Sequence, residues 1–82
     1  MEKDQEFLQF ILEGILPDAE SFKVQRTTDE RGIFFEVEVE GEEMGKLIGK
    51  QGKNITAIRT LLSVFGAKSG QRISLKIKER EV

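Results

Sequence analysis

Two glycines three residues apart, Gly49 and Gly52, carry the clearest chemistry in the sequence, because lysines stand at positions 50 and 53. Glycine allows backbone conformations that other residues avoid, and its missing Cβ lets a ligand approach closely. The amides of residues 50–53 can then converge on an anion. A helix that starts near Lys53 would add the positive end of its dipole and its unpaired N–H groups. The spacing therefore predicts a phosphate-binding turn. The alternative, a plain corner between two helices, has no need of lysines at this end.

Phosphate loops of other kinds do not fit the same stretch. A Walker-type loop needs a glycine five residues before the Gly-Lys pair and a serine or threonine after it. Leu47 and Asn54 stand at those two positions, so the hydroxyl that would hold magnesium is missing. The dinucleotide pattern G-x-G-x-x-G does not occur either. Nucleotide hydrolysis and dinucleotide binding are therefore not expected.

The composition limits the chemistry further. The chain has 82 residues, enough for one domain with little area to spare for a buried cleft. It contains no cysteine, histidine, tyrosine or tryptophan, which removes the commonest general base, metal ligand and thiol nucleophile. We therefore expect a single domain over residues 1–82 that is not an enzyme and takes no metal, cofactor or small-molecule substrate. The acidic N-terminus lacks the apolar core of a signal peptide. No apolar run approaches the roughly 18 residues of a membrane span. A cytoplasmic protein without a membrane partner is expected.

The net charge of −2 conceals a strong asymmetry between the two halves of the chain. Residues 1–43 hold 4 Lys/Arg and 13 Asp/Glu, a charge of −9, whereas residues 44–82 hold 9 Lys/Arg and 2 Asp/Glu, a charge of +7. Such asymmetry indicates a polyanion as the partner of one surface. The alternative is that the two halves neutralise each other within the fold, and both readings can hold in part.

Hydrophobic spacing in the first half predicts a helix followed by a hairpin. Asp4 is suited to cap the start of the helix and Pro17 to end it. A short strand over residues 22–25, a turn at 29–32 and a strand over 33–40 with strict alternation then predict a hairpin with a longish loop. The helix would bury five apolar residues that recur at helical spacing: Phe7, Leu8, Ile11, Leu12 and Ile15.

The second half predicts two helices joined by the glycine turn. A short helix over residues 44–48 would follow Glu42 and Glu43, whose charges suit the positive end of a helix. A longer helix would run over about residues 53–65. Five apolar residues of the longer helix would face the core: Ile55, Ile58, Leu61, Leu62 and Phe65.

A short loop bounded by Gly66 and Gly70 would lead from this helix to a last strand. Ile73, Leu75 and Ile77 alternate there with polar residues, which is the pattern of a half-buried strand. The element order is then helix, strand, strand, helix, helix, strand.

From the strand at 33–40 onward, this order resembles the β-α-α-β unit of the KH domain of RNA-binding proteins. The helix and strand that come first correspond to the prokaryotic, type II arrangement. The residues that carry the resemblance are GKLIGKQGK at 45–53 and AIRTLL at 57–62, which are similar to the stand-alone bacterial KH proteins of the KhpA family. The resemblance implies an α+β domain with a three-stranded sheet and its helices on one face.

The resemblance also implies binding of single-stranded RNA. In KH domains the GxxG loop clamps the backbone of about four nucleotides, and the bases lie against aliphatic side chains. Ile58 fits core packing better than such a groove. An RRM stacks bases on sheet aromatics, and it is not favoured because the outward strand positions offer only Phe34, amid glutamates. The RNA-binding residues expected on these grounds are Gly49, Lys50, Gln51, Gly52, Lys53, Lys46, Ile48, Ile55 and Arg59.

The parity of the strands sorts the basic residues. The glutamates at 36, 38 and 40 face outward on one strand, and Arg72, Lys76 and Lys78 face outward on the last strand. If these strands are neighbours, as in KH folds, the charges pair across the sheet, each pair contributing at most about 1 kcal/mol. Arg59 is equally suited to contacting RNA and to covering a solvent-exposed face. The basic residues left for RNA are Lys46, Lys50, Lys53 and Arg59, with Lys68 and Arg72 as weaker candidates.

A protein-interaction role is the second hypothesis. Phe10 and Phe34 lie off the core faces and could seed an interface, although scattered exposed apolar side chains are common. The resemblance implies homodimers, or pairing with a second KH protein of the Jag (KhpB) type. It also implies an RNA chaperone role tied in some bacteria to cell shape and cell wall biogenesis. The alternative to RNA binding is thus a dimerising adaptor module in which RNA binding is secondary.

Overall fold

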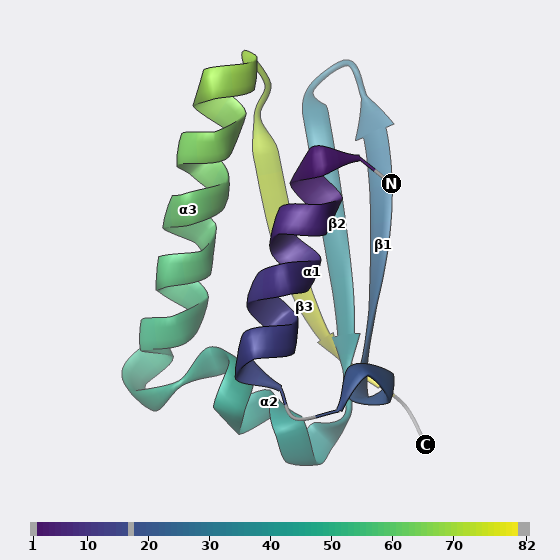
Figure 1. The fold of residues 1–82 in the computed structure, drawn as a ribbon, viewed down its shortest axis with the longest axis vertical. Coiled ribbons are helices and arrows are strands. Elements are labelled where there is room, and N and C mark those ends of the chain that lie inside the picture. Colours follow the sequence, from purple (N-terminus) through teal and green to yellow (C-terminus); the bar gives the residue numbers. More distant parts are fainter. Residues whose placement is uncertain (1, 17, 81–82) are drawn as a thin grey trace.

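The computed structural model describes residues 2–16 and 18–80. Within them the chain forms a helix and a hairpin, followed by two helices and a last strand (Figure 1). Single 3-10 turns, η1 and η2, precede the first strand and the last helix. The elements in chain order are α1 (Lys3–Ile15), η1 (Ala19–Ser21), β1 (Phe22–Asp29), β2 (Gly32–Val39), α2 (Gly41–Ile48), η2 (Lys50–Gly52), α3 (Lys53–Ser69) and β3 (Ile73–Glu79).

The three strands form one mixed sheet with the order β1-β2-β3. β1 and β2 are antiparallel and joined by a tight turn, with Thr27 opposite Phe34. β3 pairs with β2 in parallel, with Ser74 opposite Phe34, because the two helices between them carry the chain back along the sheet. α1 and α3 lie over one face of the sheet, and α2 crosses one end of it (Figure 1). The expected α+β fold, with its element order and with helices on one face, is confirmed.

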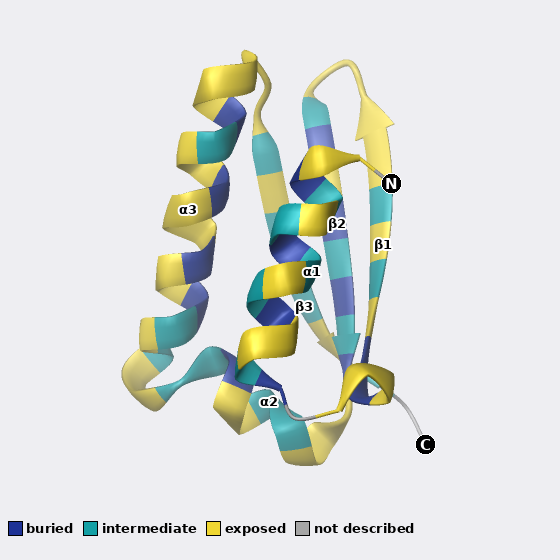
Figure 2. Cartoon of the chain, viewed as in Figure 1, coloured by how far each residue is buried: buried dark blue, intermediate teal, exposed yellow. Residues whose placement is uncertain are grey.

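The core lies between this helical layer and the sheet. On β2 the odd-numbered residues from Ile33 to Val39 are buried, and the even-numbered residues from 34 to 38 are half-buried or exposed (Figure 2). This alternation is what a strand with one covered face requires. Seven residues are almost completely buried: Phe35, Leu8, Leu12, Leu47, Leu62, Val37 and Val39.

The first helix differs from the expectation at its start. Asp4 does not cap it: the helix begins at Lys3 after Glu2, and Asp4 lies buried in its first turn. Two hydrogen bonds from Arg26 on β1, at 2.9 and 3.1 Å, satisfy the Asp4 carboxylate and tie the helix to the sheet. These bonds with Asp4 also raise the pKa of the Arg26 guanidinium. Pro17, expected to end the helix, lies outside the described residues.

Three boundaries were also predicted wrongly. α3 does not end at Phe65 but continues to Ser69, because Gly66 is buried within the helix against Ile73 of β3 and does not terminate it. β1 extends to Asp29, so the hairpin loop is tight. α2 begins at Gly41, three residues before the expected start.

One core prediction on α3 is wrong as well. Leu61 does not face the core but is 46% exposed, on the outer side of the helix. Leu62 and Ile58 fill the core positions of these turns. No helix in the described part of the chain is long and apolar enough to cross a bilayer.

Candidate nucleic-acid interface

The glycine turn joins the end of α2 to the start of α3 at one end of the molecule (Figure 1). Its backbone has positive φ at three of four positions: Gly49 (φ 78°), Gln51 (φ 57°) and Gly52 (φ 76°). Gln51 and Gly52 lie in the left-handed helical region, and Gly52 is the N-cap of α3. The chain thereby turns from α2 into α3 within one 3-10 turn, and the side chains of Lys50 and Gln51 are exposed at its tip.

The two glycines are required for different reasons. A Cβ on Gly49 would lie 2.9 Å from the backbone nitrogen of Asn54 and 2.7 Å from its Cγ. Gly49 also has φ 78° and ψ 171°, a region that is almost confined to glycine. A Cβ on Gly52 would contact only Ile55, at an ordinary 3.9 Å. Gly52 is therefore required by its backbone conformation, and Gly49 by both conformation and space.

The turn also satisfies part of its own backbone. The Gly52 N–H donates to the Gly49 carbonyl oxygen at 3.1 Å, and the Lys53 N–H donates to the Lys50 carbonyl oxygen. These two amides are used inside the turn and do not converge on an external anion. Four amides were expected to converge on an anion. Of these, only the amides of Lys50 and Gln51 take no part in these two bonds.

Asn54 braces the turn, a role that sequence reasoning missed. Its side-chain nitrogen donates to the carbonyl oxygen of Lys46 at 2.8 Å, in the last turn of α2. The bond joins the end of one helix to the first turn of the next and satisfies a carbonyl that the helix end would leave open. The signal was present: an amide side chain two residues after Gly52, where a helix begins, is suited to such a bond.

The predicted cations occupy different settings. Lys50 and Lys53 are exposed, and no carboxylate of residues 2–16 and 18–80 pairs with either. Lys46 lies 3.4 Å from Glu43, one turn earlier on α2. Arg59 reaches across to β3, where Nη2 donates to the Leu75 carbonyl oxygen at 3.4 Å. The turn thus presents two unpaired cations, whereas Lys46 and Arg59 have partners within the protein.

The predicted aliphatic residues flank the turn. Ile48, the last residue of α2, is half-buried, and Ile55, in the first turn of α3, is buried but lies outside the main core cluster. Ile58 belongs to that cluster, as its spacing predicted. The structure therefore brings Ile48 and Ile55 together with the five residues of the turn at one end of the fold: Gly49, Lys50, Gln51, Gly52 and Lys53. Lys46 and Arg59 lie at the margins of this surface.

Lys76 and Lys78 are arranged as the parity predicted, whereas Arg72 lies just before β3 and has no glutamate of β2 opposite it. In the parallel register Lys76 lies opposite Glu36, and Lys78 lies opposite Glu38. The Lys78 Nζ is 3.9 Å from a Glu38 carboxylate oxygen. Arg80 makes a similar contact with Glu40 at 3.6 Å. Three glutamates of the acidic half thus face three cations of the basic half along this part of the sheet.

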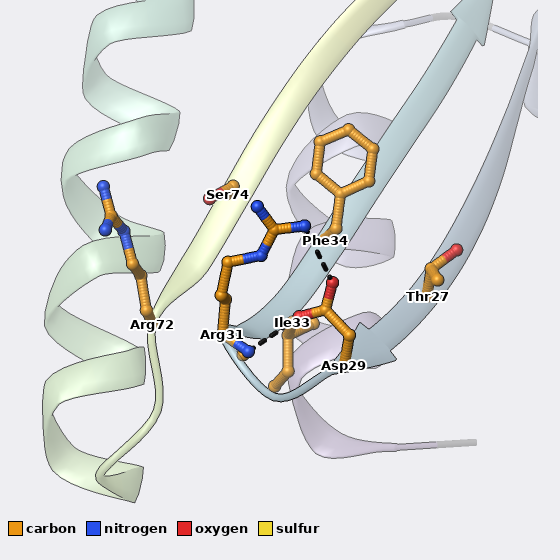
Figure 3. A pocket seen from close by; sticks show the side chains of 8 residues that line it. Thr27, Asp29, Arg31, Ile33, Phe34, Arg72 and Ser74 are labelled. Atoms are coloured by element: carbon orange, nitrogen blue, oxygen red, sulfur yellow. Dashed lines mark hydrogen bonds and ion pairs between the residues drawn. The ribbon is translucent and has the colours of Figure 1, made fainter.

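A hollow of about 460 Å³ lies at the other end of the molecule, between the β1–β2 turn and the start of β3 (Figure 3). Of the predicted RNA-binding residues, only Arg72, one of the two weaker candidates, lines it. Phe34 stands in this hollow with Thr27 and Ser74 on either side, so it is not surrounded by glutamates as expected. Within the described residues, no group of three potential ligands could hold a metal ion.

A helix and strand followed by a β-α-α-β unit, with a positive-φ Gly-x-x-Gly turn between its two helices, define a KH domain of the prokaryotic, type II arrangement. The sequence model of the KhpA/KhpB KH domain matches residues 5–77. The chain belongs to this family.

Relatives from distant bacteria align over nearly the whole chain. A protein of Chlamydia pneumoniae is 34% identical over 77 residues, which cover 94% of this chain and 99% of the relative. One from Aquifex aeolicus is 31% identical and one from Clostridium acetobutylicum 33%, with 92% and 89% of this chain covered and 95% and 97% of those relatives. All three carry the name RNA-binding protein KhpA.

Proposed function

We propose that the protein binds single-stranded RNA and grips its backbone with the Gly49–Gly52 turn. The observation that carries the proposal is the pair of exposed cations, Lys50 and Lys53, on a glycine turn that leads directly into a 17-residue helix. Phosphates there meet the lysines together with the positive end of the helix dipole. The names of the relatives support RNA as the ligand.

The surface around the turn suits the rest of a short strand. Four nucleotides are about the length that a KH loop holds. Bases of the bound strand would lie against Ile48 and Ile55, whose side chains adjoin the turn. Lys46 and Arg59 would contribute charge from the margins, less strongly than the turn lysines because each already has a partner.

The proposed activity is binding without catalysis. Reversible backbone contacts with little base readout suit an RNA chaperone, which must hold and release many strands. We extend the proposal to that role in the cytoplasm. Links to cell shape and cell wall biogenesis rest on the family resemblance alone.

The turn is tested by Lys50→Asp combined with Gln51→Asp. Both side chains are exposed, so the fold should persist, while two carboxylates would repel the phosphates directly. We expect affinity for a short single-stranded RNA to fall at least tenfold, about 1.4 kcal/mol. Fluorescence anisotropy of a labelled oligonucleotide measures the loss, and circular dichroism checks the fold.

A matched control is Lys3→Asp combined with Gln5→Asp at the start of α1. It changes the net charge by the same amount and also places carboxylates at a helix N-terminus, but at a different helix. This control should bind RNA within about twofold of wild type. Equal affinity of the wild type and the turn variant, with both folded, would overturn the backbone grip.

A second candidate function is protein pairing through the outer side of the helical layer. Phe10 is 76% exposed on α1, and Leu61 and Val64 are 46% and 63% exposed on α3. The two helices are in contact, with Phe7 stacked on Phe65 at 5.3 Å between ring centroids. Phe34 lies on the far face of the sheet and does not belong to this surface. We propose that the outer side pairs with a second copy or with a KH protein of the Jag (KhpB) type.

Phe10→Glu tests the pairing, because a carboxylate in an apolar contact costs far more than one exposed to water. Sedimentation should shift toward the monomer without loss of helicity. Gln9→Glu, the neighbouring residue with the same added charge, is the control and should leave sedimentation unchanged. A wild type that stays monomeric at high concentration, alone and with the second KH protein, would contradict the proposal.

A further inference from the structure

The hollow on the open face of the sheet is built around one aromatic ring. Phe34 is 40% exposed, and it forms a row across the sheet with Thr27 of β1 and Ser74 of β3. A flat apolar ring flanked by two hydroxyls suits a nucleobase, whose face stacks on the ring while its polar edge finds hydrogen-bonding groups nearby. Glu36, the next outward residue of β2, lies opposite Lys76 and is thereby partly neutralised.

Two guanidinium groups stand at the rim of the hollow (Figure 3). Arg31 leans over it between Ser74 and Phe34, with its side chain 91% exposed. Its contact with Asp29, at 3.5 Å, is a solvent-exposed ion pair and contributes little. Arg72 also lines the hollow, at the start of β3 and on the side of α3. The lining of the hollow thus holds one carboxylate and two guanidinium groups, a net positive charge.

The hollow continues around the start of β3 toward α3. A second depression, of about 530 Å³, shares Arg72 and Ser74 with the first and is also lined by Ser63 and Ala67 of α3. No acidic residue lines this part, and Arg72 is its charged member. Two depressions that meet at Arg72 and Ser74 suit an elongated, negatively charged ligand. The glycine turn lies at the other end of the same helix, α3.

We propose that the hollow is a second contact for single-stranded RNA, with a base stacked on Phe34 and the adjoining phosphates held by Arg31 and Arg72. The proposal rests on the proposed function, because the strand would reach the hollow after leaving the turn. α3 has 17 residues and is about 25 Å long, so only a strand longer than the turn itself holds can engage both ends. An acidic peptide would match the guanidinium groups but would leave the ring and its hydroxyls unused.

The test compares two labelled oligouridines. One has about four nucleotides, the length that fills the turn, and the other has roughly 15, enough to pass along α3. Phe34→Leu keeps the apolar volume and removes the stacking plane. We expect this variant to lower the affinity for the long oligouridine at least about fivefold and to leave the affinity for the short one unchanged. Arg72→Ala should act in the same direction, whereas Phe34→Tyr should bind as wild type does.

Lys76→Ala is the charge control for Arg72→Ala, because Lys76 lies on β3, four residues after Arg72, and does not line the hollow. It should leave the affinity for the long strand within about twofold. Ultraviolet crosslinking of the long oligouridine supplies an independent readout, since the tryptic peptide of residues 32–46 contains Phe34. Mass spectrometry should place the crosslink on that residue, and thermal unfolding checks that each variant is folded.

The outcomes separate the two contacts. The second contact alone would be overturned by three results together. The turn variant would lose affinity for both oligouridines, Phe34→Leu would bind the long one as wild type does, and no crosslink would appear at Phe34. If the turn variant binds both strands as wild type does, the proposed function fails first. A glutamate-rich peptide is the last competitor. If it displaces the long oligouridine equally well from wild type and Phe34→Leu, but not from Arg72→Ala, the hollow belongs to a protein partner and the RNA contact is overturned.

Discussion

The cations of the glycine turn and those of β3 come from the same basic half of the chain, yet their surroundings are opposite. On β3, Lys76 and Lys78 lie opposite glutamates of the neighbouring strand, and Lys78 and Arg80, which follows the strand, lie within 4 Å of a glutamate. At the turn, Lys50 and Lys53 project from a backbone that is held by its own bonds and by Asn54. The first group belongs to the sheet, and the second is free to meet a ligand.

The two groups of cations thus differ in availability, which the number of basic residues does not reveal. A charge that already has a partner gains little from a phosphate, because the old contact must be given up. The turn keeps its lysines available by using backbone and amide groups for its own stability. Perturbing either the backbone of the turn or the charges of the two regions should therefore have distinct effects.

The largest effect is expected from replacing the first glycine. Gly49→Ala introduces a Cβ against Asn54 and forces alanine into a region almost confined to glycine, so it should lower the free energy of unfolding by about 2 kcal/mol or more. Gly52→Ala meets no close atom and should cost about 1 kcal/mol. Urea denaturation measures both. Equal losses would mean that the turn relaxes around Gly49 and that the close approach of Asn54 is not a constraint.

Removing the brace should have the next largest effect. Asn54→Ala deletes the hydrogen bond to the Lys46 carbonyl and should cost about 1 kcal/mol in stability. Because the two helix ends then move more freely, the affinity for RNA should fall as well. Asn54→Asp cannot donate this bond and should lose similar stability. If Asn54→Ala has the same free energy of unfolding and the same affinity for RNA as wild type, the bond does not hold the turn.

The smallest effect separates the two groups of cations directly. With about three or four phosphates neutralised, log K against log salt concentration should slope by roughly −2 to −3 for a single strand. Lys53→Ala should flatten that slope by about 0.7, the contribution of one phosphate contact. Lys78→Ala should leave it unchanged, since Lys78 faces Glu38. Titrations at several salt concentrations decide this, and identical slopes for the two variants would erase the distinction.

The sequence predicted the fold well where one pattern dominated. Strict alternation on β2 and the helical stripe from Phe7 to Ile15 left no competing arrangement. It failed where a residue had two possible roles. Gly66 can end a helix or let a strand approach one, and Asp4 can cap a helix or pair with an arginine. In both cases the deciding partner, Ile73 or Arg26, lies on a different element, and its position depends on how the elements pack.

The candidate site was predictable in its backbone and less so in its contacts. The glycine spacing located the turn, and the strand parity correctly set Lys78 apart from Lys50 and Lys53. The contacts of Lys46 and Asn54 depend on how α2 and α3 meet, which spacing does not specify. The neighbours of Phe34 were missed because they come from the register of two other strands.

The parallel pairing of β2 with β3 has a consequence for how the chain is made. The β1–β2 hairpin can form from neighbouring residues, whereas Ile33 meets Ile73 only after both intervening helices have been synthesised. Contacts between such distant residues form more slowly than local ones. The edge of β2 that takes up β3 therefore stays unpaired until the last strand has been made. Docking of the basic strand closes this edge and brings Lys78 to Glu38.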